Sequence, residues 1–239
     1  MTCDVARVQQ AFPDRRIVHY AAIDSTMHPA AGMEVGSVVI AGEQTAGQGR
    51  HGHSWHSEAG CGLYVSVVLA PSPVLTLALG LATVEAIAQV TGVACDLRWP
   101  NDVMIGPRKV AGILVQLVDG RAIAGLGINV NHRTFPPELA SQATSLRLAA
   151  GGSEIASTEL LIGLLHAIDC LVREDKETIL RLFTQSSSYA AGRRVTVALP
   201  GGAIEGTTAG LDADGFLIVR KDDGTDTLIL AGGVRAARS

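Results

Sequence analysis

The chain has 239 residues, 47% of them hydrophobic, which is enough for one large domain, or for a medium and a small one, around a substantial core. Its formal net charge of −4, without a basic tail or stripe, argues against a nucleic-acid-binding protein. No apolar run approaches the roughly 20 residues of a membrane-spanning helix, and the first residues lack the apolar segment of a signal peptide. The four cysteines are scattered without a C-x-x-C pair, so the sequence predicts a cytoplasmic protein.

The first half of the chain predicts strands and one long helix. Strands are expected over residues 16–24 and 35–43, separated by a short segment that begins with helix-capping residues. Residues 62–70 alternate apolar and other side chains, which is typical of a strand. Residues 72–92 predict an apolar helix that ends at Gly92.

The middle of the chain predicts a strand, a break at Pro100 and a second strand over residues 93–106. A hairpin follows over residues 109–131, with Asp119 and Gly120 as its turn. A strong amphipathic helix is expected to begin near Ser157.

The character of the sequence changes near Gly192. From there on, short strands alternate with Gly, Pro and Asp turns at intervals of 8–12 residues, which is typical of a small all-β module. We therefore predict a first domain over residues 1–189 and a β domain over residues 190–239.

A glycine-rich loop, EQTAGQGRHGHSW, spans residues 43–55. Gly47, Gly49 and Gly52 allow the backbone to approach a ligand closely, and Arg50 suits a carboxylate or a phosphate. The loop is not a Walker A loop, because no Gly-Lys-Ser/Thr follows, and it is not a dinucleotide fingerprint, because a strand comes next. The loop alone supports an ordinary flexible connector equally well.

Three histidines in and after this loop, His51, His53 and His56, raise the alternative of a metal site. No carboxylate or thiol cluster accompanies them, and a glycine loop is a poor frame for coordination. The sequence therefore predicts no metal bound by the protein itself.

Lys109 is one of only three lysines among 19 basic residues, and it opens an apolar strand after Asn101 and Asp102. A compact ammonium group that faces a cleft is a good point charge for a phosphate. When Lys109 is considered alone, the better interpretation is that it lies at the end of a strand and extends its ammonium group to water. Asn129 and Asn131 at the next strand end fit turn chemistry, and Ser25 with Thr26 fits a helix cap.

Taken together and in this order, the motifs DSTM, EQTAGQGRHGHSW, RWPNDV, RKVAGILVQ and GLGINVN resemble those of biotin protein ligases, from about residue 17 to the C-terminus. The resemblance implies an α+β fold: a mixed sheet with helices, similar to class II aminoacyl-tRNA synthetases and lipoate ligases, followed by a small SH3-like β barrel. It also implies ATP-dependent attachment of biotin to a lysine of a biotin carboxyl carrier protein, through biotinyl-5′-adenylate. The implied cofactors and substrates are ATP, biotin and Mg²⁺.

The resemblance also assigns roles to residues of this sequence. Lys109, Arg50 and Asn101 are implied as catalytic, with Lys109 between the biotin carboxylate and the α-phosphate. The implied biotin-binding residues are Ser25, Thr26, Met27, Gln44, Gln48, Gly49, Arg50, Lys109 and Gly112. The implied nucleotide-binding residues are Arg50, Trp55, Asn101, Lys109 and Asn129, with Trp55 near adenine.

The sequence departs from the family pattern at three positions. Gln48 stands where the first arginine of G-R-G-R is common, so one cation over the adenylate is missing. Arg98 replaces the usual lysine before W-P-N-D and keeps its charge, and Met27 replaces the usual asparagine after Ser-Thr. About 24 residues precede the Asp-Ser-Thr motif, too few for the winged helix-turn-helix of some members, so we expect a monofunctional ligase.

Two other classes of function remain open at this point. One is a lipoate or octanoate ligase or transferase on a related fold, against which the full glycine loop argues. The other is a biotin- or biotinyl-adenylate-binding protein that has lost turnover, against which Arg50 and Lys109 argue. We expect no nucleic-acid or membrane partner, and the oligomeric state stays open, with a homodimer as one option.

Overall fold

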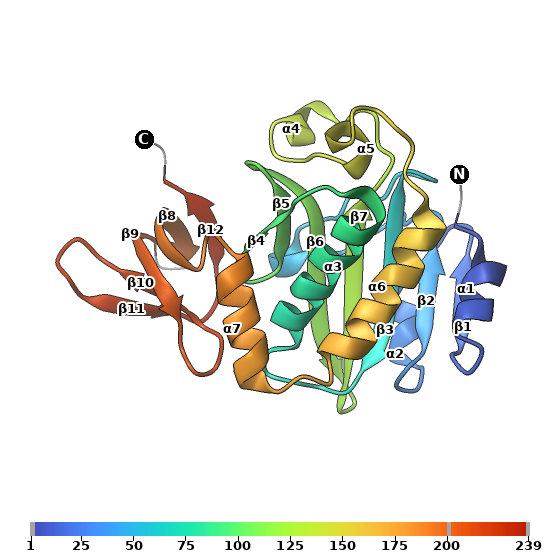
Figure 1. Ribbon diagram of the computed structural model, residues 1–239, viewed down its shortest axis with the longest axis horizontal. Coiled ribbons are helices and arrows are strands. Elements are labelled where there is room, and N and C mark those ends of the chain that lie inside the picture. Colours follow the sequence, from blue (N-terminus) through green and yellow to red (C-terminus); the bar gives the residue numbers. More distant parts are fainter. Residues whose placement is uncertain (1–2, 200–201, 238–239) are drawn as a thin grey trace.

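The computed structural model describes residues 3–199 and 202–237 and contains a large mixed sheet, flanked by helices, followed by a smaller antiparallel sheet (Figure 1). The strands of the large sheet are β1 (Ile17–Tyr20), β2 (Val38–Ala41), β3 (Gly62–Leu69), β4 (Asp96–Arg98), β5 (Asp102–Ile105), β6 (Arg108–Val118) and β7 (Arg121–Asn129). Their order is β1-β2-β3-β7-β6-β5-β4, and β1 and β2 pair in parallel while the neighbouring pairs that follow are antiparallel. The predicted mixed α+β sheet is confirmed.

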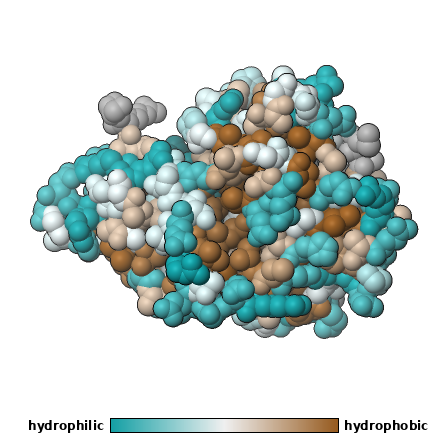
Figure 2. Space-filling view, in the orientation of Figure 1, coloured by the Kyte–Doolittle hydropathy of each residue, from teal (hydrophilic) through white to brown (hydrophobic). Residues whose placement is uncertain are grey.

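Two long helices cover one face of this sheet (Figure 1). They are α3 (Leu75–Thr91) and α6 (Ser157–Leu171), and their apolar side chains form the main core with the inward residues of β3, β6 and β7. Both helices agree with the prediction, and Gly92 ends α3 in a left-handed conformation with φ of 68°. Figure 2 shows apolar residues gathered in the middle of this face.

A short helix, α2 (Met27–Ala31), lies on the opposite face of the sheet. It forms a second, smaller core, whose buried residues are Met27, Ala30, Met33, Val39, Val68 and Ile123. The first residues of α2 thereby stand beside β3 and β7, which positions the Asp-Ser-Thr segment next to the centre of the sheet.

Several elements differ from the sequence-based expectation. The strand expected over residues 16–24 stops at Tyr20, and beyond it Ile23 makes only an isolated parallel bridge to Gln44, in the register of the β1–β2 pair. Four short or polar helices were not predicted: α1 (Val5–Ala11), α4 (Pro137–Ala140), α5 (Leu146–Ala149) and α7 (Lys176–Ser186). In α7 only Ile179 and Phe183 are buried, so its apolar stripe is too narrow to stand out in the sequence.

The C-terminal module is a five-stranded antiparallel sheet of order β11-β10-β9-β8-β12. Its strands are β8 (Ala191–Leu199), β9 (Gly202–Leu211), β10 (Leu217–Arg220), β11 (Asp226–Ile229) and β12 (Gly233–Ala236). Of the turns expected here, the one at residues 200–201 lies outside the described residues. The module contacts the large sheet where the Trp99 indole donates a hydrogen bond of 2.9 Å to the Gly215 carbonyl. None of the helices in the described ranges is long and apolar enough to cross a bilayer.

Candidate active site

A small cavity lies between the glycine loop, the start of α2 and the middle of β6 and β7. Its lining is formed by Ser25, Thr26, Met27, Gln44, Gln48, Gly49, Arg50, Trp55, Val65, Asn101, Lys109, Gly112, Ile113, Leu114, Gly125, Leu126 and Gly127. Every residue to which the resemblance assigns a role lines this cavity except Asn129, which is buried at the end of β7. The free volume is about 50 Å³, well below the roughly 300–1,000 Å³ of typical ligand pockets.

Two glycines opposite each other explain why the sheet is open at this point. Gly112 on β6 pairs directly with Gly127 on β7, so the sheet has no side chain there. The Trp55 indole occupies the resulting space, and a methyl group at Gly127 would collide with it. The indole Nε1 is buried and has no hydrogen-bond partner within the described ranges. Trp55 therefore fills the cavity and presents an unused donor.

One end of the cavity carries a network of neutral hydrogen bonds. The side-chain carbonyl of Gln44 accepts from the backbone amide of Thr26 at 2.9 Å and from its hydroxyl at 3.1 Å. The amide group of Gln44 donates to Ser57 at 3.0 Å, and the hydroxyls of Thr26 and Ser66 are 2.8 Å apart. Thr26 stands at the N-cap position of α2, but its hydroxyl serves this network and makes no cap bond. The helix-cap interpretation therefore accounts for the position of Thr26 at the start of α2, but not for the hydrogen bonds of its hydroxyl.

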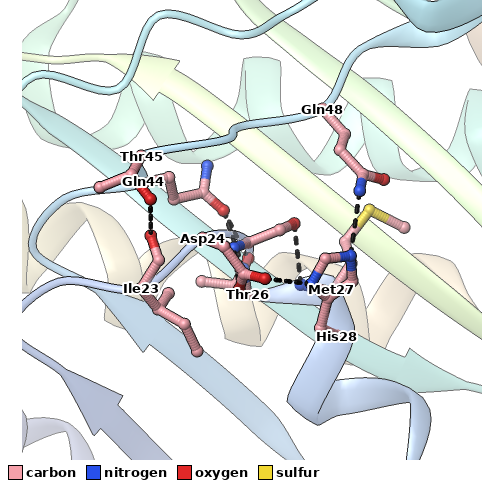
Figure 3. Close-up of polar contacts among 9 residues, drawn as sticks. Ile23, Asp24, Thr26, Met27, His28, Gln44, Thr45 and Gln48 are labelled. Atoms are coloured by element: carbon pink, nitrogen blue, oxygen red, sulfur yellow. Dashed lines mark hydrogen bonds and ion pairs between the residues drawn. The ribbon is translucent and has the colours of Figure 1, made fainter.

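The glycine loop is tied to α2 by a second set of contacts (Figure 3). His28 lies between two partners: its Nδ1 is 2.7 Å from the Asp24 carboxylate, and its Nε2 is 3.1 Å from the Gln48 amide nitrogen. Because an amide nitrogen can only donate, Gln48 donates to Nε2 and the proton of the ring is on Nδ1, facing Asp24. A chain of Asp24, His28 and Gln48 thus links the helix to the loop.

The other end of the cavity carries the cations. The Lys109 ammonium group is 2.5 Å from the Asp102 carboxylate and 5.2 Å from the centroid of the Trp55 ring. Arg98 contacts the second oxygen of Asp102 at 2.6 Å. Burial alone would raise the pKa of Asp102, but Lys109 and Arg98 outweigh it and lower that pKa. Asp102 is therefore ionised, and its negative charge balances the positive charge of Lys109 and holds the ammonium group in position.

Arg50 extends from the glycine loop to the same end. Its guanidinium group donates to the Asn101 side-chain oxygen at 2.9 Å, and the Asn101 amide donates to the Ile113 carbonyl at 2.9 Å. Burial lowers the pKa of Arg50, an effect that nearby Asp102 opposes. Asn101 thus holds Arg50 against β6, close to Lys109.

The backbone of the glycine loop forms its own short hairpin. The Gly49 amide donates to the His53 carbonyl at 2.7 Å, and the Trp55 amide donates to the Gly47 carbonyl at 2.8 Å. In this conformation the Gly49 amide is already used by a hydrogen bond within the loop.

Comparisons with known proteins agree with this geometry. Residues 20–132 match the biotin/lipoate A/B protein ligase family, and residues 191–234 match the biotin protein ligase C-terminal domain. The chain is 32% identical over 224 residues to the biotin–[acetyl-CoA-carboxylase] ligase of Mycobacterium tuberculosis, covering 88% of this chain and 82% of that protein. The chain belongs to the biotin protein ligase family.

Other biotin protein ligases extend the comparison. Among solved structures, the biotin protein ligase from Aquifex aeolicus in complex with biotin and ATP has a TM-score of 0.83 and 31% identity, covering 94% of this chain and 99% of that one. The bifunctional ligase/repressor BirA of Bacillus subtilis is 34% identical over 208 residues, which are 79% of this chain and 63% of that relative. The chain thus spans less than two thirds of that relative's length.

For a biotin protein ligase, the sequence reasoning missed four functional candidates. Asp102 was assigned no role, although it pairs with Lys109. Ser57 and Ser66 gave no signal, because their partner Gln44 is distant in sequence. Gly127 could have been found from the sequence. Gly125 and Gly127 are two residues apart in a predicted strand and so share one face, and Gly127 pairs with Gly112 across the predicted hairpin.

Proposed function

We propose that the chain activates biotin with ATP and transfers it from biotinyl-5′-adenylate to a lysine of a biotin carboxyl carrier protein. The observation that carries the proposal is a single cavity with a neutral hydrogen-bonding end, apolar walls and a cationic end, in a chain of the biotin protein ligase family. Biotin has a matching order of groups: a ureido head, an apolar ring and chain, and a carboxylate.

Each part of biotin would meet suitable groups. The ureido head has two N–H donors and one carbonyl acceptor, and Thr26, Gln44, Ser25 and the serines beside them supply both roles. The apolar part would lie against Gly112 and Gly127, in the space that Trp55 now fills. The free volume of about 50 Å³ is too small for biotin, so we propose that the indole moves out when biotin enters.

The chemistry follows from the cationic end. The biotin carboxylate attacks the α-phosphorus of ATP, a P–O bond forms, and the bond to pyrophosphate breaks. Negative charge grows on the non-bridging oxygens of the α-phosphate, and Lys109 and Arg50 provide fixed positive charge for it. Lys109 would exchange its contact with Asp102 for the phosphate. In the second step a carrier lysine attacks the acyl carbon and AMP leaves.

Mg²⁺ would neutralise the phosphate groups of ATP, and its preference for oxygen ligands fits the carboxylate of Asp102 and the side-chain oxygen of Asn101. The remaining ligands of such an ion would be phosphate and water oxygens. The protein's own contribution is to hold Lys109, Arg50 and Asn101 in one place.

We propose that the β domain over residues 190–239 completes the nucleotide side of this site. Trp99 contacts Gly215 of the module and precedes Asn101 and Asp102 by only two or three residues. Cutting the chain near residue 190 should therefore reduce adenylate formation or nucleotide affinity. Full activity of a folded 1–190 fragment would contradict this role.

Pyrophosphate release with ATP and either biotin, lipoate or octanoate tests the activity directly. We expect release with biotin only, and transfer of biotin to an apo-carrier domain when that domain is added. Release with lipoate or octanoate instead would indicate the related ligase class. Biotin binding without pyrophosphate release would indicate a binding protein.

A further inference from the structure

Three metal-ligating side chains meet outside the cavity, where the chain that follows the glycine loop passes the end of β7. His56 and Glu58 come from the segment before β3, and His132 comes three residues after β7. Each offers one ligand atom, and these atoms all lie within 4.8 Å of one another. His56 Nε2 is 3.8 Å from the Glu58 carboxylate, and the two imidazole rings are 5.9 Å apart between centroids.

His132 is the member of this cluster whose surroundings require an explanation. Its side chain is fully buried, and neither ring nitrogen has a hydrogen-bond partner in the described part of the chain. A buried polar atom without a partner costs about 1–3 kcal/mol, so such atoms in a folded protein commonly serve an ion, a water or a reaction. Phe135 stacks on the ring at 5.0 Å between centroids and 17° between planes, which fixes its orientation.

We propose that His56, Glu58 and His132 bind a divalent first-row transition metal ion of the zinc class. Two imidazole nitrogens and one carboxylate oxygen are a common protein ligand set for Zn²⁺, with water as the fourth ligand. Tetrahedral bonds of about 2.0–2.1 Å place ligand atoms about 3.4 Å apart, so the cluster must contract by little more than 1 Å. His56 is half-buried and Glu58 is exposed, so both side chains have room to make this movement.

This site differs from the metal site that the sequence raised. The histidines of the glycine loop, His51 and His53, are exposed and do not join the cluster. The carboxylate comes from Glu58, which was not grouped with the histidines in the sequence analysis, and the third ligand comes from a position 76 residues after His56.

A metal ion at this position would connect two segments that flank the cavity. His56 follows Trp55, which fills the cavity, so a bound ion would fix the C-terminal end of the glycine loop to the end of β7. Binding to the folded state alone would also stabilise the protein against unfolding. The proposed role of the ion is to join these two segments, and no step of the proposed reaction passes through it.

The test is calorimetric titration of tag-free, chelator-treated protein with Zn²⁺, with a thermal melt at each step. We expect one Zn²⁺ per chain and a higher melting temperature with Zn²⁺. His56→Gln, at a half-buried position, and Glu58→Gln, at an exposed one, should each weaken binding at least about tenfold. His53→Gln is the matched control, because it removes a histidine of the same segment that lies outside the cluster.

Co²⁺ provides a second readout that is independent of stability. Bound by two imidazoles and a carboxylate, it should give the intense visible bands of low-coordinate cobalt, and His132→Asn should abolish them. The proposal is overturned if the wild type shows no saturable binding at one ion per chain. It is also overturned if His53→Gln weakens binding as much as His56→Gln does.

Discussion

The two ends of the cavity are built on opposite principles. At one end Gln44, Thr26 and Ser57 are neutral and already hydrogen-bonded to each other. At the other end Lys109 and Arg50 are charged and are held by Asp102 and Asn101. We expect the groups of the neutral end to keep these partners when a ligand binds. The cations of the other end would have to leave Asp102 or Asn101 to contact a phosphate.

This difference teaches how one cavity can separate binding from catalysis. Groups that keep the same partners throughout a reaction bind the substrate and the transition state equally well, and they affect mainly affinity. Cations that exchange a carboxylate for a phosphate act most strongly where the phosphate is most negative, and they affect mainly rate. Substitutions at the two ends should therefore change different kinetic parameters.

The largest effect is expected for Lys109→Ala. Because the charge of Lys109 matters most in the transition state, we expect the barrier to adenylate formation to rise by about 2–4 kcal/mol, with little change in nucleotide affinity. Lys109→Arg should also be poor, since a planar guanidinium does not replace a compact ammonium group against Asp102. Pre-steady-state pyrophosphate release measures the effect. Near-normal release in Lys109→Ala would remove this residue from the catalytic set.

The neutral end should show the opposite pattern. Gln44→Ala leaves Thr26 and Ser57 without their partner and removes groups for the ureido head, so we expect KM for biotin to rise by a factor equivalent to about 1–3 kcal/mol. The turnover number should change little. A fall in turnover number with an unchanged KM would contradict the division between the two ends.

Arg50→Gly tests whether a cation also retains the intermediate. The chain has Gln48 where a second arginine is common in the family, so Arg50 supplies most of the side-chain charge of the loop. We expect the variant to form adenylate but to release it about tenfold faster, a change of 1.4 kcal/mol. ATP-dependent labelling of albumin lysines with biotin measures the escape. Adenylate formation without increased labelling would assign retention to the backbone of the loop alone.

The pairing of Asp102 should appear as a dependence of stability on pH. Lys109 and Arg98 hold the pKa of Asp102 below its unfolded value, so the ionised carboxylate stabilises the fold above that value and the contribution is lost as pH falls through the folded pKa. Because the side chain keeps 16% exposure, we expect an effect on the order of 1 kcal/mol. The stability difference between wild type and Asp102→Asn should be constant from neutral pH to about 5 and shrink below about 4. Urea unfolding at several pH values measures it, and a difference that grows on acidification would have the wrong sign.

How much of the fold and of the site could be predicted from the sequence depends on how far apart in the chain the residues that determine each feature lie. The α3 helix, its end at Gly92 and the Asp119–Gly120 turn are local patterns, and all three were predicted correctly. The gathering of Gln44, Arg50 and Lys109 came from a family resemblance, because nothing in the spacing of these residues indicates contact. The Asp102–Lys109 pair depends on the register between β5 and β6, which includes a bulge after Val103. Such a register is set by packing across the sheet and cannot be read from one strand.

The smallest effect is expected for the link between α2 and the glycine loop, the contact of His28 with Gln48. His28 is about half exposed and its contact is with a neutral amide, so its loss should change stability by only about 0.5 kcal/mol. The consequence should be local: without His28 the Gln48 side chain is free, and the Gly49 and Trp55 amides of the loop hairpin should exchange hydrogen faster in His28→Ala. Adding biotin should restore much of the protection, because the ligand then holds the loop. His19→Ala, at an exposed histidine on β1, is the matched control and should leave these amides unchanged. If exchange is the same in His28→Ala and the wild type, the loop is held by its own hairpin and by Arg50, and the contact with His28 exerts no control over it.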